Sequence, residues 1–412
     1  MRRQLKPPNR VVFVMYNIIC EVAAVNEGVV EKQKMPAFLS ILKKIAGFLK
    51  HNIVAVIAFA AAVITSIIIP PDAAYLDYFD FKTLTCLFCV LAVVCALKNI
   101  SFFYSLAQSI VQRFKNLRTC VLVLVYITFI GSMLIANDMA LLTFLPLGYF
   151  ILSSTDKKNY MAFTFIMQNI AANLGGMLTP FGNPQNLYLY TKFNIPTFEF
   201  IKIMAIPFAL SVVLITVCCI IFVKPEKLQI DNEQIKLPAG RTVLYLCLFA
   251  LSIAIVFRGI PYWIGLIIIP AVLLFADREA LKQVDYALLL TFVFFFVFAG
   301  NMARIDIVRD ILSFFMEKST LLFSVISCQF ISNVPSAILL SQFTQNYQEL
   351  LIGVNIGGAG TLIASLASLI TFKEYCNHNP NRTGYYIKRF AAFNFGFLSI
   401  LTGVMMGLNA LQ

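Results

Sequence analysis

The segment Asn173-Leu-Gly-Gly-Met-Leu-Thr-Pro-Phe-Gly-Asn-Pro-Gln-Asn-Leu187 interrupts a chain that is otherwise rich in long apolar runs. A counterpart follows later, Asn355-Ile-Gly-Gly-Ala-Gly-Thr-Leu-Ile-Ala-Ser-Leu-Ala-Ser-Leu369, with Asn, Gly, Gly, Thr and Leu in the same register. Glycine, proline and small polar residues interrupt helices, and inside a bilayer such backbone persists only where it is buried in protein or lines a cavity. The two segments therefore predict paired helix breaks.

The composition indicates a chain that resides in a lipid bilayer. It is 60% hydrophobic and 13% charged, with 39 Phe. A helix needs about 20 apolar residues to span a membrane. The clearest apolar runs are 52–70, 83–97, 197–223, 242–257, 261–276, 286–300 and 385–411. The net charge of +12 is carried in short loops between these runs, which is the pattern of a membrane protein and excludes a nucleic-acid partner.

The N-terminal stretch 1–34 has three interpretations, which the sequence leaves open. Four basic residues precede an apolar run that contains Asn17 and Glu21. The stretch is a weak match to a signal peptide, an extension upstream of a start at Met35, or an interfacial helix. It contributes nothing to the functional argument.

Three landmarks recur in the same order along the chain. Asp80-Phe81 and Asp285-Tyr286 each open an apolar run, and Asn137 and Asn333 each follow an Ile-x pair. The third landmark is the pair of Asn-x-Gly-Gly segments, and the three offsets are 205, 196 and 182 residues. Two repeats of roughly 200 residues are the simplest explanation.

The loop charges predict how these repeats cross the membrane. Nine of the 32 Lys and Arg residues precede residue 53, so we expect a cytoplasmic N-terminus. The run 119–150 has basic flanks on both sides, which predicts a hairpin re-entering from the cytoplasm with Asn137-Asp138 near its tip. The same logic predicts a hairpin from the opposite side over 319–345, with Ser332-Asn333 at its tip.

The expected fold is therefore an all-α polytopic membrane protein with about nine full spans and two re-entrant hairpins. One extra span between the repeats inverts the second relative to the first and places the C-terminus outside. The expected parts are a cytoplasmic N-terminal extension 1–52, repeat 1 over 53–223, a cytoplasmic linker 224–241, a connecting span 242–260 and repeat 2 over 261–412.

The hairpin tips are candidate binding positions. Broken helices offer N–H groups to an anion and free carbonyls to a cation. Asn137, Asp138, Ser332 and Asn333 lie at the two tips, and capping of the turns is the structural alternative. A carboxylate at membrane depth costs roughly 2.5–3.5 kcal/mol on insertion scales, so Asp138 points to an ion or proton path, although a helix N-cap also explains it.

The two interrupted segments supply the remaining candidates. Thr179, Gly182, Asn183 and Asn186 match Thr361, Ala364, Ser365 and Ser368 by position. We expect Thr179, Gly182, Asn183, Asn186, Thr361, Ser365 and Ser368 to complete a substrate or ion site. Asn173, Gly175 and Gly176 are assigned to close helix packing first.

Enzymatic activity has no support in the sequence. The chain has no Walker A motif, no Gly-x-Ser-x-Gly and no His-Glu-x-x-His. Its two histidines lie near segment ends, and most of its ten cysteines lie in apolar runs. We expect no cofactor other than a coupling ion, with possible sodium ligands at Asn137, Asp138 and Asn333.

These motifs resemble the ion transporter superfamily over roughly residues 50–411. The nearest branch is the citrate-transporter-like group with the arsenite permeases and NhaD-type antiporters, and the divalent anion:sodium symporters are more distant. The resemblance implies a scaffold and a moving transport domain, a homodimer and an elevator motion. In the symporters, Ser-Asn-Thr motifs at both tips bind sodium and carboxylate. Here Ala136 stands in place of the first Ser, and Asp138 and Val334 replace the two Thr.

The expected function is secondary active transport of a small carboxylate or inorganic anion across the inner or plasma membrane, coupled to sodium or protons. Three alternatives remain at this point: a sodium/proton antiporter in which Asp138 alternates between the two ions, an arsenite-type efflux permease, and a passive channel on the same repeats. Uptake against a gradient separates a transporter from a channel.

Overall fold

The computed structural model describes residues 53–228 and 237–411. The expectations for the N-terminal extension and for the middle of the linker lie outside these residues. Residues Ile57–Gln412 form one compact unit, and the contacts given below lie within it.

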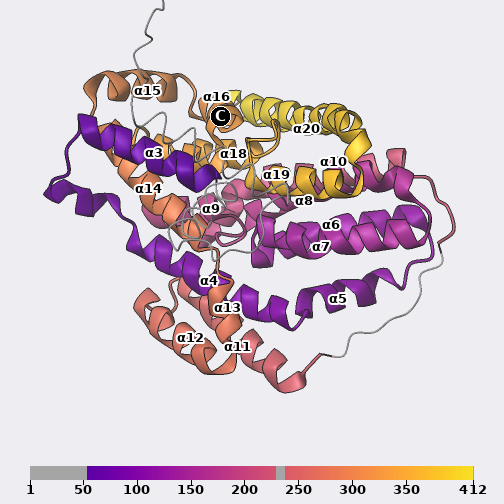
Figure 1. The fold of residues 1–412 in the computed structure, drawn as a ribbon. Coiled ribbons are helices and arrows are strands. Elements are labelled where there is room, and N and C mark those ends of the chain that lie inside the picture. Colours follow the sequence, from indigo (N-terminus) through magenta and orange to yellow (C-terminus); the bar gives the residue numbers. More distant parts are fainter. Residues whose placement is uncertain (1–52, 229–236, 412) are drawn as a thin grey trace, which may run out of the picture. The chain divides into compact units, whose positions relative to one another are not determined.

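The elements of the described residues are helices, as the apolar runs predict (Figure 1). The first half contains α3 (Ile53–Ile68), η1 (Ala73–Tyr78), α4 (Phe81–Asn99), α5 (Phe102–Val111), α6 (Leu117–Ile135), α7 (Asn137–Ser154), η2 (Lys158–Tyr160), α8 (Met161–Gly175), η3 (Gly176–Leu178), α9 (Pro184–Lys192) and α10 (Thr197–Phe222). The second half contains α11 (Ala239–Val256), α12 (Tyr262–Ala276), α13 (Arg278–Lys282), α14 (Tyr286–Ala303), α15 (Asp306–Lys318), α16 (Thr320–Ile331), α17 (Asn333–Leu340), α18 (Tyr347–Ile356), α19 (Leu366–His378), η4 (Pro380–Arg382) and α20 (Thr383–Ala410).

Six of the described helices are long and apolar enough to cross a membrane. They are Phe81–Asn99, Leu117–Ile135, Thr197–Phe222, Ala239–Val256, Arg278–Ala303 and Pro380–Ala410. Four more apolar helices are shorter, and they include Thr320–Ile331. The chain is thus a multi-pass, all-helical membrane protein.

Burial separates an inner helix from outer ones. Every residue of α8 is buried, and this helix packs against α6, α7, α10 and α19. In contrast, α10 exposes large apolar side chains such as Phe198, Val213 and Ile221. Contiguous exposed apolar surface is unusual for a soluble protein. We interpret this face of α10 as the one that contacts lipid.

Helices α6 and α7 form an antiparallel pair joined through the single residue Ala136, and they lie side by side in Figure 1. Both outer ends of the pair meet the same short segment. At the start of α6, the Leu117 N–H donates to the Glu226 carbonyl at 2.8 Å. Beyond the end of α7, Lys157 Nζ lies 2.5 Å from Glu226 Oε2. The pair therefore enters and leaves at one face, the face that carries the start of the linker.

The ion pair at this face shifts the pKa of both partners. The hydrogen bond to Glu226 raises the pKa of Lys157, and the bond from Lys157 lowers the pKa of Glu226. Both groups therefore stay charged at neutral pH. Lys157, after α7, thus contacts the first residues of the linker.

The second helix pair, α16 and α17, has the same construction. A single residue, Ser332, joins the two helices. Thr320 Oγ1 at the outer start of α16 lies 3.4 Å from Thr344 Oγ1, which follows the end of α17. The run 319–345 therefore folds back on itself, as 119–150 does.

The acidic-aromatic landmarks are helix N-caps. Asp80 Oδ1 accepts a hydrogen bond from the Thr83 N–H at 2.9 Å, and Asp285 Oδ1 accepts one from the Leu288 N–H at 2.9 Å. Such caps satisfy backbone donors that have no partner within the first helical turn. The recurrence of this pair in the sequence thus marks the starts of α4 and α14.

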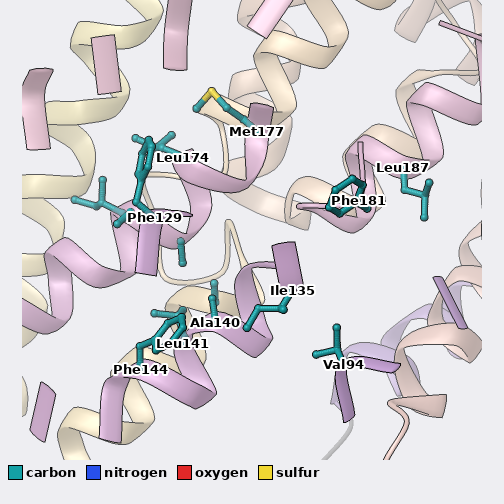
Figure 2. Close-up of a cluster of buried hydrophobic side chains, with 14 of the residues drawn as sticks. Val94, Phe129, Ile135, Ala140, Leu141, Phe144, Leu174, Met177, Phe181 and Leu187 are labelled. Carbon is teal, nitrogen blue, oxygen red and sulfur yellow. The ribbon is translucent and has the colours of Figure 1, made fainter. Parts of the chain in front are cut away.

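The first helix pair contributes side chains to the hydrophobic core (Figure 2). Phe129 and Ile135 come from α6 and Leu141 comes from α7, whereas Leu174 and Met177 lie at and just beyond the end of α8. All five side chains are buried. Tight packing of these apolar side chains fixes the position of the residues next to the first helix break, after α8.

Two glycines allow the hairpin helices to approach the broken ones. A Cβ at Gly175 would overlap the Phe129 carbonyl oxygen and lie 2.7 Å from Ser132 Oγ. At the matching Gly357, a Cβ would lie 2.8 Å from Cys328 Sγ. The packing role assigned to the first Gly-Gly pair agrees with this geometry.

Substituting Gly175 by alanine is expected to destabilise the protein. The new methyl group meets backbone, which has little room to move, and overpacking of this kind costs about 1–3 kcal/mol. Gly384→Ala is the matched control, because a Cβ there meets nothing within 4 Å and alanine favours the helix. We expect a lower melting temperature in detergent for Gly175→Ala alone. Equal melting temperatures for both variants would contradict the packing role.

Candidate functional site

The two hairpin turns have the same unusual backbone conformation. Ala136 has φ 65° and ψ 154°, and Ser332 has φ 72° and ψ 160°. This region is almost restricted to glycine and costs about 1–3 kcal/mol for other residues, which keep it only where the surroundings enforce it. The strain therefore occurs at Ser332, one of the predicted tip residues, and at Ala136, directly before the predicted tip Asn137-Asp138.

The asparagines after the two turns also make matching bonds. Asn137 Oδ1 accepts from the Asp138 N–H at 2.9 Å, and Asn333 Oδ1 accepts from the Val334 N–H at 2.9 Å. Both asparagine side chains are buried. Each tip thus uses its asparagine oxygen locally, and the amide nitrogen is left for other contacts.

The two threonines predicted as ligands are bound to the hairpins. Thr179 Oγ1 donates to the Met133 carbonyl at 2.8 Å, and Thr361 Oγ1 donates to the Gln329 carbonyl at 3.0 Å. Met133 and Gln329 precede their tip asparagines by the same number of residues. In this structure the hydroxyls fasten each helix break to its own hairpin.

Both broken helices restart in the same way. Asn183 and Ser365 are the N-cap residues of α9 and α19, and both have extended backbones. One residue earlier, the Gly182 N–H donates to the Thr179 carbonyl at 3.2 Å, and Ala364 makes the equivalent bond. The sequence alignment of the two segments therefore corresponds to equal local structure.

Asn173 connects the two halves of the chain. Its Oδ1 accepts from Asn137 Nδ2 at 3.1 Å and from Ser365 Oγ at 2.7 Å. The second tip is bound to the same region, because the Asn333 N–H donates to the Ala364 carbonyl at 2.9 Å. Ser332 Oγ donates to that carbonyl too, at 3.2 Å. Both hairpin tips thus meet the break before α19.

Asn355 makes the corresponding connection to the first break. Its Nδ2 donates to Asn186 Oδ1 at 2.6 Å, and its Oδ1 accepts from Asn183 Nδ2 at 3.2 Å. Asn183 Oδ1 and Ser368 Oγ are buried without a hydrogen-bond partner. Buried polar groups normally have partners, so each of these atoms is free to bond to a ligand or a water molecule.

A small cavity of about 80 Å³ lies beside the first tip. Its lining includes Ala136 and Asp138, the helix starts at Pro184 and Leu366, and Asp285 at the start of α14. The charged side chains among the described lining residues are Asp138 and Asp285, and both are acidic. The fixed positive charge at this cavity comes from helix N-termini.

Asp138 does not cap its helix in this structure. The N-cap position of α7 is Ala136, and Asp138 is the second residue of the helix. Its Oδ1 is buried and has no hydrogen-bond partner. The matching position in the second half is Val334, so the carboxylate is a feature of the first tip.

Three residues at the site were not among the binding residues predicted from the sequence. Asn173 was placed in a packing role, Asn355 was noted only as part of the repeat, and Asp285 only as a landmark. The signal for the two asparagines was their equal register at the start of both segments. Their cross-half bonds, and the position of Asp285 at the cavity, follow from tertiary structure.

The fold and the site together define a membrane transport protein. Residues 37–351 match the model of the family described as citrate transporter, and the chain belongs to this family. It is 33% identical over 296 residues to an uncharacterised transporter of Methanocaldococcus jannaschii, covering 71% of this chain and 81% of that protein. It is 28% identical over 306 residues to the inner membrane protein YbiR of Escherichia coli, covering 71% and 80%. The family and the archaeal relative agree with the expectation that the protein is a transporter and not an enzyme.

Proposed function

We propose that this protein is a secondary active transporter that moves a small carboxylate or inorganic anion together with sodium ions or protons. The observation that carries the proposal is that hydrogen bonds join both hairpin tips and both helix breaks. Asparagine side chains link the first tip and the two breaks, and the second tip donates to the Ala364 carbonyl before α19. Paired broken helices of this kind form the substrate and ion sites of secondary transporters. The site residues are those predicted from the sequence, with Asn173 and Asn355 joining them.

The charge of the cavity favours an anion that arrives with cations. The N-termini of α7, α9 and α19 border the cavity, and each helix N-terminus carries about half a positive charge. The acidic side chains at Asp138 and Asp285 oppose a bare anion. A proton or sodium ion taken up with the substrate resolves this conflict, so the electrostatics support coupled transport over passive conduction.

The matched bonds of the two halves support an alternating-access mechanism built on inverted repeats. Equal backbone angles at Ala136 and Ser332, and equal bonds at Thr179 and Thr361, are expected when two repeats share one structure. We propose nine spans and two re-entrant hairpins in the inner or plasma membrane, an elevator motion, and a homodimer as the working unit.

Uptake by proteoliposomes tests the function. Purified protein is reconstituted and supplied with citrate, succinate, phosphate or sulfate, under an inward sodium gradient, an inward proton gradient or neither. We expect uphill accumulation of at least one anion with one of the gradients. Downhill flux without accumulation would identify a channel, sodium/proton exchange without any anion would identify an antiporter, and arsenite export alone would identify an efflux permease.

The proposed topology makes a separate prediction. Reporter fusions after Lys227 and after Leu411 are expected to report opposite sides of the membrane, with Lys227 in the cytoplasm. The reason is the positive charge of the loops around the first hairpin and the linker. If both fusions report the same side of the membrane, the proposed inversion of the repeats is wrong. That result would not bear on the proposed binding site.

A further inference from the structure

The side-chain amide of Asn173 makes hydrogen bonds through its oxygen but not through its nitrogen. Its Oδ1 accepts two hydrogen bonds, from Asn137 and from Ser365. Its Nδ2 has no hydrogen-bond partner, although the side chain is only 2% exposed. A buried donor without a partner is unfavourable and rare in folded proteins.

The counterpart in the second half behaves differently. Asn355 uses both ends of its amide, because Nδ2 donates to Asn186 Oδ1 and to the Leu351 carbonyl at 2.8 Å, and Oδ1 accepts from Asn183. The two asparagines occupy equal positions in the repeats. The free donor is thus specific to Asn173 and does not follow from the repeat.

The surroundings place Asn173 between the two tips. Asn137 is bonded to it directly. A Cβ built on Gly358 would lie 3.1 Å from Asn333 Nδ2 and 3.8 Å from Asn173 Oδ1, so the second tip lies against the same stretch of backbone. The Oδ1 end of the Asn173 amide therefore lies between the two tips, and Nδ2 is the second polar atom of the same amide.

We propose that Asn173 binds the transported anion through Nδ2, while its Oδ1 holds the first tip against the start of α19. This inference rests on the proposed function and names the residue that selects the charge of the ligand. An N–H donor pairs with an oxygen acceptor of a carboxylate or oxyanion, and it repels a metal cation. The coupling ion is bound by other groups, such as the carboxylate of Asp138.

Asn173→Asp is the informative substitution. It preserves the shape and the accepting oxygen, and it replaces the free donor by an acceptor. We expect anion affinity to fall about tenfold or more at pH 8, since a charge-assisted hydrogen bond is lost. Burial raises the pKa of an aspartate above its ordinary value of about 3.9. Lowering the pH to 5.5 therefore returns a proton, and with it a donor, to part of the introduced carboxyl, and the affinity relative to wild type at the same pH should partly recover. A purely structural role predicts no such recovery.

Asn169→Asp is the matched control. Asn169 lies one turn earlier on α8, is fully buried, and donates to Asn394 Oδ1, away from the tips. The same charge change there should leave the affinity at the wild-type value. Asn173→Ser replaces the aspartate variant if the latter does not fold, as judged by size-exclusion chromatography, and it should also weaken the affinity.

Thermal shift with citrate, succinate, phosphate and sulfate provides the measurement, and the anion that stabilises wild type most serves as the probe. If none of the four anions stabilises the wild-type protein, the result contradicts the proposed function and, with it, this inference. If wild type binds one of the anions and a folded Asn173→Asp protein binds it with equal affinity, this inference is wrong and the proposed function stands. An equal loss in Asn169→Asp would overturn it as well, because buried charge on α8 would then explain the effect.

Discussion

Alanine at Asn137 or at Asn333 is expected to abolish transport while folded protein remains in the membrane. Asn137 joins the first tip to Asn173, and its oxygen binds the N–H of the next residue. Asn333 makes the same local bond at the second tip. Loss of such bonds at a buried site costs about 1–3 kcal/mol, and the upper end of this range corresponds to a rate about a hundredfold lower.

Initial uptake per reconstituted protein is the measurement for these variants. Asn301→Ala is the matched control, since Asn301 is fully buried and donates to Thr65 and Ser66, far from the tips along the chain. We expect this control to transport at the wild-type rate once corrected for folded protein. Wild-type uptake by both tip variants would place the substrate site elsewhere.

The sequence predicted the elements of the fold well because each apolar run is a local signal. The runs near 83–97, 197–223 and 286–300 appear as α4, α10 and α14. The hairpins were predicted from basic residues on both flanks, and the bonds of Glu226 to both ends of the first pair agree with that reasoning. Membrane span counts and repeat inversion stay predictions.

The positions of the tips were also predictable, whereas their partners were not. Ala136 and Ser332 lie where small polar residues interrupt two apolar runs, so the breaks have a local cause. Thr179 and Thr361 were predicted to face a ligand, but their hydroxyls donate to backbone carbonyls. A side-chain hydroxyl pairs with whichever acceptor the tertiary structure brings near, and the sequence does not specify it.

Cross-half contacts were the part that sequence reasoning missed. Ser365 and Asn173 are 192 residues apart, and Asn183 and Asn355 are 172 apart. Their pairing depends on how the two halves dock, and no local pattern encodes this. Asp285 illustrates the same limit, because its role as an N-cap is local and its place at the Asp138 cavity is not.

Asp138→Asn is expected to uncouple transport from the ion gradient or to stop it. The carboxylate at the first tip has a buried oxygen without a partner, beside a cavity whose other charged lining residue is Asp285. Such a carboxylate lowers its free energy by taking up a proton or binding a cation. Asparagine does neither, so gradient-driven uptake should fall by at least about tenfold, the equivalent of about 1.4 kcal/mol.

A purely structural role for Asp138 predicts the opposite result, because asparagine has nearly the same shape as aspartate. Asp80→Asn is the matched control, since Asp80 caps α4 and asparagine should preserve that cap. We expect this control to keep wild-type dependence on sodium and pH, measured as initial uptake across a series of sodium concentrations and pH values. If Asp138→Asn keeps the same dependence as well, the carboxylate takes no part in coupling.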